Sequence, residues 1–257
     1  MSMTSLKGKR GLIVGIANKS SIAYGCAKAC KDLGAEDLAI TYLNAKAEAH
    51  VRPVAEELGA GIFMPCDVRV GGELEAVFAE ISRTWGRLDF VLHSIAFAPR
   101  DDLHARVTDC SRDGFMMAMD VSCHSFIRMA RLAEPLMPEG GCLQTVSFYG
   151  AEKVVENYNL MGPVKAALES VTRYLAYELG PKGIRVHTLS PGPLATRAAS
   201  GIDHFDELMA KAADRAPQQR LVTIEDVGAY SAFLASDAAK AVTGSLIYVD
   251  AGYNIMG

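Results

Sequence analysis

The hydrophobic pattern alternates between two kinds of segment along the whole chain. Short apolar runs stopped by small or polar residues are typical of buried strands in a parallel sheet. Longer segments with apolar positions at helical spacing come between most of them. Strands are expected at 11–15, 37–42, 62–66, 88–95, 141–146, 184–189 and 245–250, and helices at 22–30, 45–58, 74–85, 116–132 and 158–179. This alternation predicts an α/β fold, a single doubly wound Rossmann-type domain over residues 1–257 with a seven-stranded parallel sheet and helices on both faces.

Residues 192–220 depart from this alternation. They are rich in proline, glycine and small residues around one short helical pattern at 205–213. A long connection after the carboxyl end of a strand is a candidate cover for a binding site. We therefore expect a short substrate-binding lid at about 193–216, inside the single domain.

Composition narrows the class of protein. The 257 residues are 50% hydrophobic, which suffices for one sizeable core. A net charge of -4 argues against a nucleic-acid-binding surface. No apolar run approaches the roughly 20 residues that span a bilayer, and residues 1–10 lack an apolar signal segment. The six cysteines are scattered and do not show zinc-ligand spacing with histidine. We expect a cytoplasmic protein with reduced thiols, no metal and no membrane segment.

Residues 15–25 join the first expected strand to the first helix. Gly15 and Ala17 are small enough to let the backbone approach a pyrophosphate, and Ser21 would add a hydroxyl. Gly25 would let the helix pack closely on the sheet. The glycines are ten residues apart, so this is not the G-x-G-x-x-G pattern, and an ordinary β-α turn with a capping serine is the alternative.

Two later positions bear on the identity of a dinucleotide. Asp67, after the third strand, could accept a hydrogen bond from an adenine amino group, or it could cap a helix. Leu43 follows the second strand, where an acidic residue would bind a ribose diol and an arginine a 2′-phosphate. Leu43 is neither, so this position marks the choice between NADH and NADPH poorly. We favour NADH, with NADPH as the alternative.

Tyr158 and Lys165 stand out after the fifth strand. If one helix spans both, their seven-residue spacing is nearly two full turns, which places them on one face about 10 Å apart along the axis. A phenol and an ammonium so placed could serve an oxyanion and a sugar-bearing cofactor. An ordinary helix surface would show the same spacing.

Several blocks of the chain together resemble the bacterial enoyl-acyl-carrier-protein reductases, a divergent branch of the short-chain dehydrogenase/reductase superfamily. The Tyr-x6-Lys spacing is specific to this branch, since the superfamily at large uses Tyr-x3-Lys, and here that intermediate position is Met161. The resemblance covers about residues 5–255. The blocks are Gly15-x5-Ser21-Ile22-Ala23-x-Gly25, Cys66-Asp67-Val68, His93 to Pro99, Tyr158-Asn159-x-Met161-Gly162-x2-Lys165, and Ala198 to Ile202.

The resemblance implies a reaction. It is the reduction of trans-2-enoyl-acyl-carrier-protein thioesters by hydride from NADH, the last step of the type II fatty-acid elongation cycle. Tyr158 would hydrogen-bond the thioester oxygen, where enolate charge develops, and Lys165 would bind the nicotinamide ribose and favour the anionic transition state. The resemblance also implies an acyl carrier protein as partner and a homotetramer.

The resemblance further implies the binding residues. Cofactor contacts are implied for Ile22, Asp67, Val68, Ser94, Ile95, Ala96, Lys165, Gly192, Pro193, Leu194 and Thr196, beside Gly15, Ala17, Ser21 and Leu43. Contacts with the acyl chain are implied for Phe97, Ala98, Tyr158, Ala198, Ala199, Ile202, Phe205 and Leu208. Phe97 and Phe205 could equally be hydrophobic core.

One position departs from the family. A tyrosine usually stands ten residues before the catalytic one, where this chain has Phe148, and Tyr149 follows it. One step along an extended strand turns a side chain to the opposite face, so Tyr149 is not a simple replacement. We expect Phe148 to form an apolar wall beside the nicotinamide, as part of the catalytic site. This change bears on substrate range and rate rather than on reaction type.

Several further residues have a structural interpretation, and two other functions are alternatives. His93 is expected to be a packed core histidine, and Phe115, Met116, Met117 and Met119 are expected to be helix core. Two alternative functions are a short-chain carbonyl reductase or dehydrogenase and a weakly active cofactor-binding paralogue. A ketone reductase would want a serine hydroxyl near Phe148, and a pure binder has no need of the Tyr158 phenol.

Overall fold

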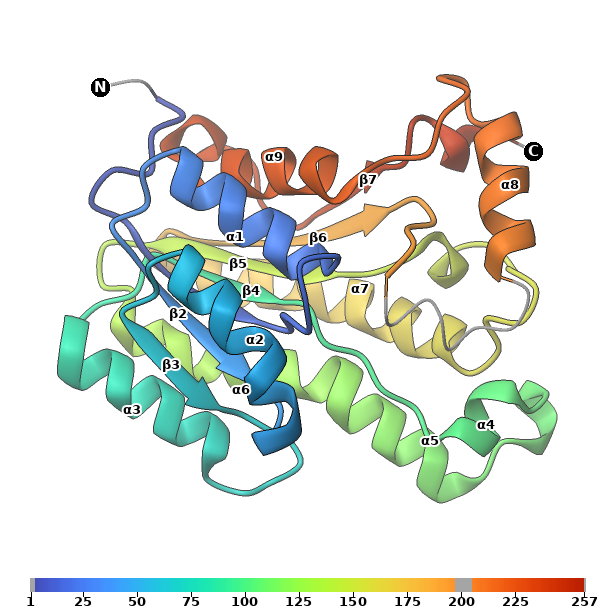
Figure 1. Ribbon diagram of the computed structural model, residues 1–257, viewed down its shortest axis with the longest axis horizontal. Helices are drawn as coiled ribbons and strands as arrows, with labels where there is room; N and C mark the ends of the chain where they lie inside the picture. Colours follow the sequence, from blue (N-terminus) through green and yellow to red (C-terminus); the bar gives the residue numbers. More distant parts are fainter. Residues whose placement is uncertain (1–2, 197–204, 257) are drawn as a thin grey trace.

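The computed structural model describes residues 3–196 and 205–256, and in them the chain forms a seven-stranded sheet. The strands lie in the order β3-β2-β1-β4-β5-β6-β7, and every neighbouring pair is parallel (Figure 1). Their bounds are β1 Arg10–Val14, β2 Asp37–Tyr42, β3 Ile62–Pro65, β4 Phe90–His93, β5 Gly141–Val146, β6 Ile184–Pro191 and β7 Ser245–Val249. The predicted doubly wound Rossmann-type fold is confirmed.

The strand order reverses between β1 and β4. The chain builds outward from β1 to β3 on one side and from β4 to β7 on the other, while β1 and β4 pair with Val14 opposite His93. At such a switch point the connections leave the two carboxyl ends in opposite directions and open a crevice between them. The topology therefore places a binding crevice beside Gly15 and Ser94.

Helices cover both faces of the sheet (Figure 1). Helices α1 (Ile22–Asp32), α2 (Ala45–Glu57) and α9 (Ile224–Ala235) bury apolar residues on one face. Helices α3 (Glu73–Trp85), α6 (Ser125–Ala133) and α7 (Met161–Leu179) do so on the other. Strands buried on both faces explain why the expected strands were continuous apolar runs. No helix within the described residues is long and apolar enough to cross a membrane.

Helices α1 and α9 touch through two glycines. A Cβ on Gly25 would lie 2.3 Å from the carbonyl oxygen of Ile224, and a Cβ on Gly228 would lie 2.3 Å from that of Gly25. Gly25 was expected to allow close packing, but the partner expected for it, the sheet, was wrong. Gly25 permits close packing against α9 rather than against the sheet.

Replacing Gly228 by alanine is expected to destabilise the protein by about 1–3 kcal/mol, because the new methyl group would press on the backbone of α1. Urea unfolding measures the change. Gly71→Ala is the matched control, since no atom lies within 4 Å of the added Cβ there. Equal stability of the two variants would contradict the close helix contact.

The expected helix at 116–132 is interrupted. It consists of α5 (Arg112–Met119), a π-helical turn (Asp120–His124) and α6. The Ser125 hydroxyl donates to the carbonyl oxygen of Val121, one turn back, at 2.7 Å. Such side-chain bonds compete with the regular helix ladder. The connection before it also holds a short helix, α4 (Arg100–His104).

Three residues expected in the core lie on the surface instead. Phe115, Met116 and Met117 are 41%, 59% and 39% exposed, and only Met119 packs against the buried clusters. Their helix, α5, extends beyond the sheet (Figure 1), and none of the described helices or strands covers these three side chains. Apolar spacing alone cannot separate a core face from a face left for a partner.

Candidate active site

Two adjoining cavities open near the carboxyl ends of the strands. The first, of about 320 Å³, is lined by the predicted residues Ile22, Ser94, Ile95, Ala96, Phe97, Ala98, Phe148, Tyr158, Lys165, Gly192, Pro193, Leu194 and Thr196, and by Leu103, Val146, Ser147, Met161 and Pro191. The second, of about 380 Å³, is lined by the predicted residues Gly15, Ala17, Leu43, Asp67, Val68 and Ser94 to Phe97, and by Val14, Ile16, Thr41, Cys66, Arg69 and Val121. Ser94 to Phe97 line both, so the cavities meet at the switch point.

The second cavity needs a glycine at position 15. Gly15 has φ +117°, and a Cβ there would lie 2.0 Å from the carbonyl oxygen of Ser94. A side chain would therefore meet backbone that cannot move aside. Ser21 shapes the same turn, because its hydroxyl oxygen accepts from the amides of Ala17 and Asn18, both at 3.0 Å. Among the described residues, Ser21 lines neither cavity, so its direct contact with a pyrophosphate stays a prediction.

At the far end of the second cavity, Asp67 is paired with Arg69. The guanidinium donates to the Asp67 carboxylate at 2.6 Å and lies 5.3 Å from the centre of the Phe97 ring. The bonds from Arg69 hold the pKa of Asp67 below its usual range, so the carboxylate is an acceptor at neutral pH. Arg69 was not among the predicted site residues.

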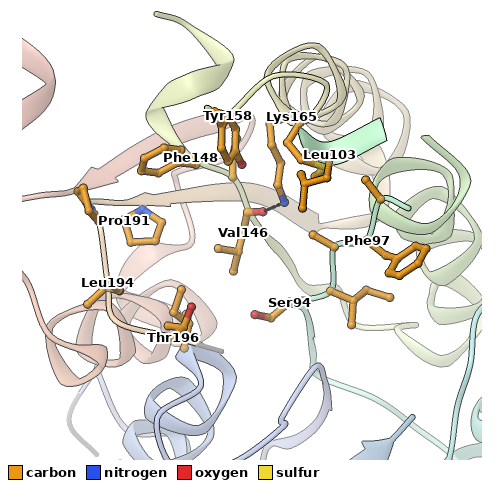
Figure 2. A pocket seen from close by; sticks show the side chains of 18 residues that line it. Ser94, Phe97, Leu103, Val146, Phe148, Tyr158, Lys165, Pro191, Leu194 and Thr196 are labelled. Carbon is orange, nitrogen blue, oxygen red and sulfur yellow. Dashed lines mark hydrogen bonds between the residues drawn. The ribbon is translucent and has the colours of Figure 1, made fainter. Parts of the chain in front are cut away.

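Tyr158 lies before α7 and not on it. The helix begins at Met161, and Asn157 and Asn159 on either side of Tyr158 have left-handed φ values of 63° and 42°. The expected helix over 158–179 was therefore wrong at its start, and the shared helix face does not explain the pair. Asparagine is one of the few residues that tolerates this backbone region. The two asparagines turn the phenol inward to the cavity (Figure 2).

The Tyr158 ring is held by close packing. It meets the Phe148 ring edge-on at 4.9 Å between centroids, and Gly150 lies so near that a Cβ there would be 2.4 Å from the Tyr158 ring. Burial raises the pKa of Tyr158 above its usual value. The phenol is therefore a protonated hydrogen-bond donor at neutral pH.

Lys165 lies on α7 and reaches the end of β5. Its Nζ donates to the carbonyl oxygen of Val146 at 2.6 Å (Figure 2), and the side chain is buried. Burial lowers the pKa of Lys165 to about 8, so the amine is mostly charged at neutral pH. A buried cation thus lies in the same cavity as the phenol.

Phe148 forms part of the wall of the first cavity, beside Tyr158 (Figure 2). Tyr149 turns away from it, and its ring meets those of Tyr253 at 5.6 Å and Tyr248 at 6.4 Å. The one-step reversal expected from an extended chain therefore holds in the structure. Tyr149 is not among the described residues that line the cavity. The ring at this place in the wall is therefore that of Phe148, which has no hydroxyl.

A buried carboxylate near the site was missed by the sequence analysis. Ser147, next to Phe148, donates its hydroxyl to Glu169 at 2.6 Å, and both side chains are buried. Glu169 stands one helical turn after Lys165, so its spacing was a readable signal. Nothing in the sequence marked Ser147 as its partner.

His93 is a core residue, as expected. Its Nδ1 lies 2.8 Å from the Thr145 hydroxyl and its Nε2 2.8 Å from the Ser125 hydroxyl. The Ser125 hydroxyl already donates to a carbonyl, so it accepts from Nε2–H, and Thr145 donates to Nδ1. Burial, with a smaller contribution from Lys165, lowers the pKa of His93 to about 3. The imidazole is neutral and fully bonded.

This histidine predicts an acid limit on stability. Its pKa is lower in the folded than in the unfolded protein, so its contribution is complete above pH ~6.5 and is lost as pH falls toward about 3. His93→Gln is expected to reduce the slope of unfolding free energy in this window by up to about 1.4 kcal/mol per pH unit. Urea titrations at several pH values measure it, with exposed His50→Gln as control. An unchanged slope in His93→Gln would refute this account.

The expected acyl-chain residues are only partly described. Ala198, Ala199 and Ile202 lie outside the described residues, and so does the side chain of Phe205. The helix α8 (Phe205–Arg215) follows, and Leu208 on it is not among the described residues that line the two cavities. Their contact with an acyl chain stays a prediction.

Comparison with known proteins decides the family. A family model described as enoyl-(acyl carrier protein) reductase matches residues 15–254. The chain belongs to this family. The resemblance drawn from the sequence motifs is thereby confirmed.

Enoyl-[acyl-carrier-protein] reductases of several bacteria match nearly the whole chain. The protein named enoyl-[acyl-carrier-protein] reductase [NADH] 1 of Rhizobium meliloti is 46% identical over 252 residues, which are 98% of this chain and 92% of that protein. The NADH enzyme of the same family from Aquifex aeolicus is 46% identical over 99% of this chain and 94% of its own length.

Solved structures of enoyl-(acyl-carrier-protein) reductases agree in fold. The enzyme of Anaplasma phagocytophilum in complex with NAD has TM-score 0.94 and 43% identity, and the match covers 98% of this chain and 96% of that one. The enzyme of Bacillus cereus with NADP+ and indole naphthyridinone has TM-score 0.95 and 43% identity, with 98% of both chains covered.

The two adjoining cavities of this enoyl-(acyl-carrier-protein) reductase fit a nicotinamide dinucleotide. Gly15 brings bare backbone to the middle of the crevice, where a pyrophosphate needs close approach. Asp67 presents an acceptor at one end and Lys165 a cation at the other. The spacing of donors, acceptors and small residues along the crevice therefore suits the cofactor.

Proposed function

We propose that this chain reduces trans-2-enoyl-acyl-carrier-protein thioesters with NADH, the last step of the type II fatty-acid elongation cycle. The observation that carries the proposal is that a buried phenol and a buried ammonium lie in one largely apolar cavity. Lys165 supplies a positive charge and Tyr158 a phenol dipole. The apolar walls are formed by Phe97, Leu103 and Phe148. A thioester with a hydrocarbon tail matches this distribution of polar and apolar surface.

When bound, the dinucleotide would supply a hydride to the β-carbon, and the enolate that forms would take up a proton from solvent at the α-carbon. Tyr158 would donate a hydrogen bond to the thioester oxygen as negative charge develops there, and burial, which raises the pKa of Tyr158, keeps the phenol protonated. Lys165 orients the ribose hydroxyls and adds a positive charge beside the same oxygen. The ring of Phe148 excludes water from that side of the reacting atoms.

The cofactor preference rests on Leu43 at the end of β2. A dinucleotide with a 2′-phosphate would need a cation at this position, and leucine offers none. NADH is therefore the proposed cofactor. Binding titrations of NADH and NADPH compare them directly, and equal affinity would overturn this assignment.

An acyl carrier protein is the proposed partner, and a homotetramer in the cytoplasm the proposed assembly. We also propose a single domain, in which residues 193–216 cover the acyl chain. Exposed apolar side chains support self-association, namely Phe115, Met116 and Met117 on α5 and Tyr174 and Tyr177 on α7. Sedimentation equilibrium tests the assembly, and a monomer at micromolar concentration would refute it.

The activity test is the loss of NADH absorbance with crotonyl and longer enoyl thioesters. NADPH and a panel of ketones and aldehydes are run in parallel. Turnover of enoyl thioesters supports the proposal. Turnover of ketones alone would support a carbonyl reductase, and cofactor binding without turnover of either class would support a paralogue with a binding role.

A further inference from the structure

We propose that Glu169 is a positioning residue of this site, which acts through Ser147 on the strand end that holds both Lys165 and Tyr158. This inference rests on the proposed function and adds a residue to its machinery. Three consecutive residues carry the argument, Val146, Ser147 and Phe148.

Each of the three residues makes a different contact with the site. The carbonyl oxygen of Val146 accepts from Lys165 at 2.6 Å, and the ring of Phe148 packs on Tyr158 at 4.9 Å between centroids. Ser147 lies between them and makes two bonds of its own. Its amide donates to the carbonyl oxygen of Leu189 at 2.7 Å and its hydroxyl to Glu169 at 2.6 Å.

The bond from Ser147 to Glu169 fixes the chain against α7. The hydrogen bond from the amide of Ser147 links this residue to β6 within the plane of the sheet. The hydrogen bond from its hydroxyl links it to α7, which packs on the face of the sheet. Glu169 is 8% exposed and Ser147 is 3% exposed, so water does not compete for this bond. Displacing Ser147 would move the carbonyl of Val146 and the ring of Phe148 together.

Glu169 also sets the charge around Lys165. Burial lowers the pKa of Lys165, while Cys123 and, less strongly, Glu169 one turn away on the same helix raise it. Burial also raises the pKa of Glu169. The titratable groups that face Glu169 are Lys165 and Arg173 on α7, Glu152 and Tyr158 in the preceding loop, and Tyr248 on β7. Cys123 and His93 also face Lys165.

Two variants separate the positioning effect of the Ser147–Glu169 hydrogen bond from the effect of the Glu169 charge. Glu169→Gln keeps an acceptor for Ser147 and removes the negative charge. The pH at which NADH affinity and kcat/KM decline on the alkaline side is expected to move downward, because the charged amine loses a nearby negative charge. Ser147→Ala keeps the charge and removes the bond, and kcat is expected to fall about tenfold or more with that pH unchanged.

Thr172→Val is the matched control. Thr172 is buried on α7, close along the helix to Glu169, and its hydroxyl bonds to Thr188 of β6 at 2.6 Å, away from the cavity. It reports any general loosening of α7 from the sheet. Its kcat is expected to stay within about twofold of the parent and its pH profile to be unchanged, whatever its loss of thermal stability.

The NADH titration keeps this proposal distinct from the proposed function. If the parent binds NADH but reduces no enoyl thioester, the function is wrong, and the shift in Glu169→Gln is still measured by binding. If Glu169→Gln has the parental pH dependence and Ser147→Ala the parental kcat, Glu169 has only a structural role. A fall in kcat of Thr172→Val as large as that of Ser147→Ala would also overturn the proposal.

Discussion

A Tyr158→Phe variant is expected to lose kcat by roughly 10²–10³-fold, because one hydrogen bond to a developing oxyanion is worth about 2–4 kcal/mol. Its NADH affinity is expected to stay near the parental value. The phenyl ring keeps the contacts with Phe148 and Gly150, so only the hydroxyl is removed. Steady-state kinetics with a crotonyl thioester and a binding titration measure the two quantities.

Tyr149→Phe is the control for this experiment. It removes a phenol from a neighbouring residue whose ring packs on Tyr248 and Tyr253. Parental kcat is expected for it. If Tyr158→Phe retains full activity, the oxyanion is stabilised by another group, and the role given to Tyr158 is wrong.

A Lys165→Met variant is expected to lose activity by about 10³-fold or more and to bind NADH at least about tenfold more weakly, since it lacks both the ribose ligand and the cation. The same change is expected to preserve or raise thermal stability at pH 7. Burial lowers the pKa of Lys165 to about 8, so folding holds a charged amine in a poorly solvated place. Methionine fills similar space without charge.

The sign of this stability effect can be checked against pH. A lysine whose pKa is lower in the folded protein stabilises it fully only above pH ~10.5, and this contribution is lost as pH falls to about 8. The parent minus Lys165→Met difference in unfolding free energy is therefore expected to rise across that window. Lys153→Met, an exposed change in the loop that precedes α7, serves as control. A flat difference would mean that Lys165 is well solvated.

Much of the fold could be predicted because its signals are local. A buried strand is a short apolar run wherever it lies in the chain, and a tight βα turn needs small residues such as Gly15 and Ala17. One local signal was overlooked. Thr223 and Asp226 form a capping box at the start of α9, which the sequence analysis did not predict.

The sequence also pointed to two residues that line one cavity, Tyr158 and Lys165, without predicting their geometry. Tyr-x6-Lys was interpreted as one helix face, yet Tyr158 precedes α7 and is turned inward by left-handed Asn157 and Asn159. A residue spacing does not determine the φ values between two positions. The two residues do line one cavity, but the structural reason given for their pairing was wrong, and their catalytic roles stay a prediction.

By itself, then, the sequence determined the parallel α/β architecture, the dinucleotide crevice and the pairing of Tyr158 with Lys165, because apolar period, small-residue turns and family motifs are properties of neighbouring residues. Only the tertiary structure decided that Glu169 bonds Ser147, that Gly25 meets α9 and that Met116 lies on the surface. Each of these depends on which elements the sheet topology brings together. The apolar character and hydrogen-bonding capacity of a residue follow from its type, but the residue that it contacts depends on the packing of the whole chain.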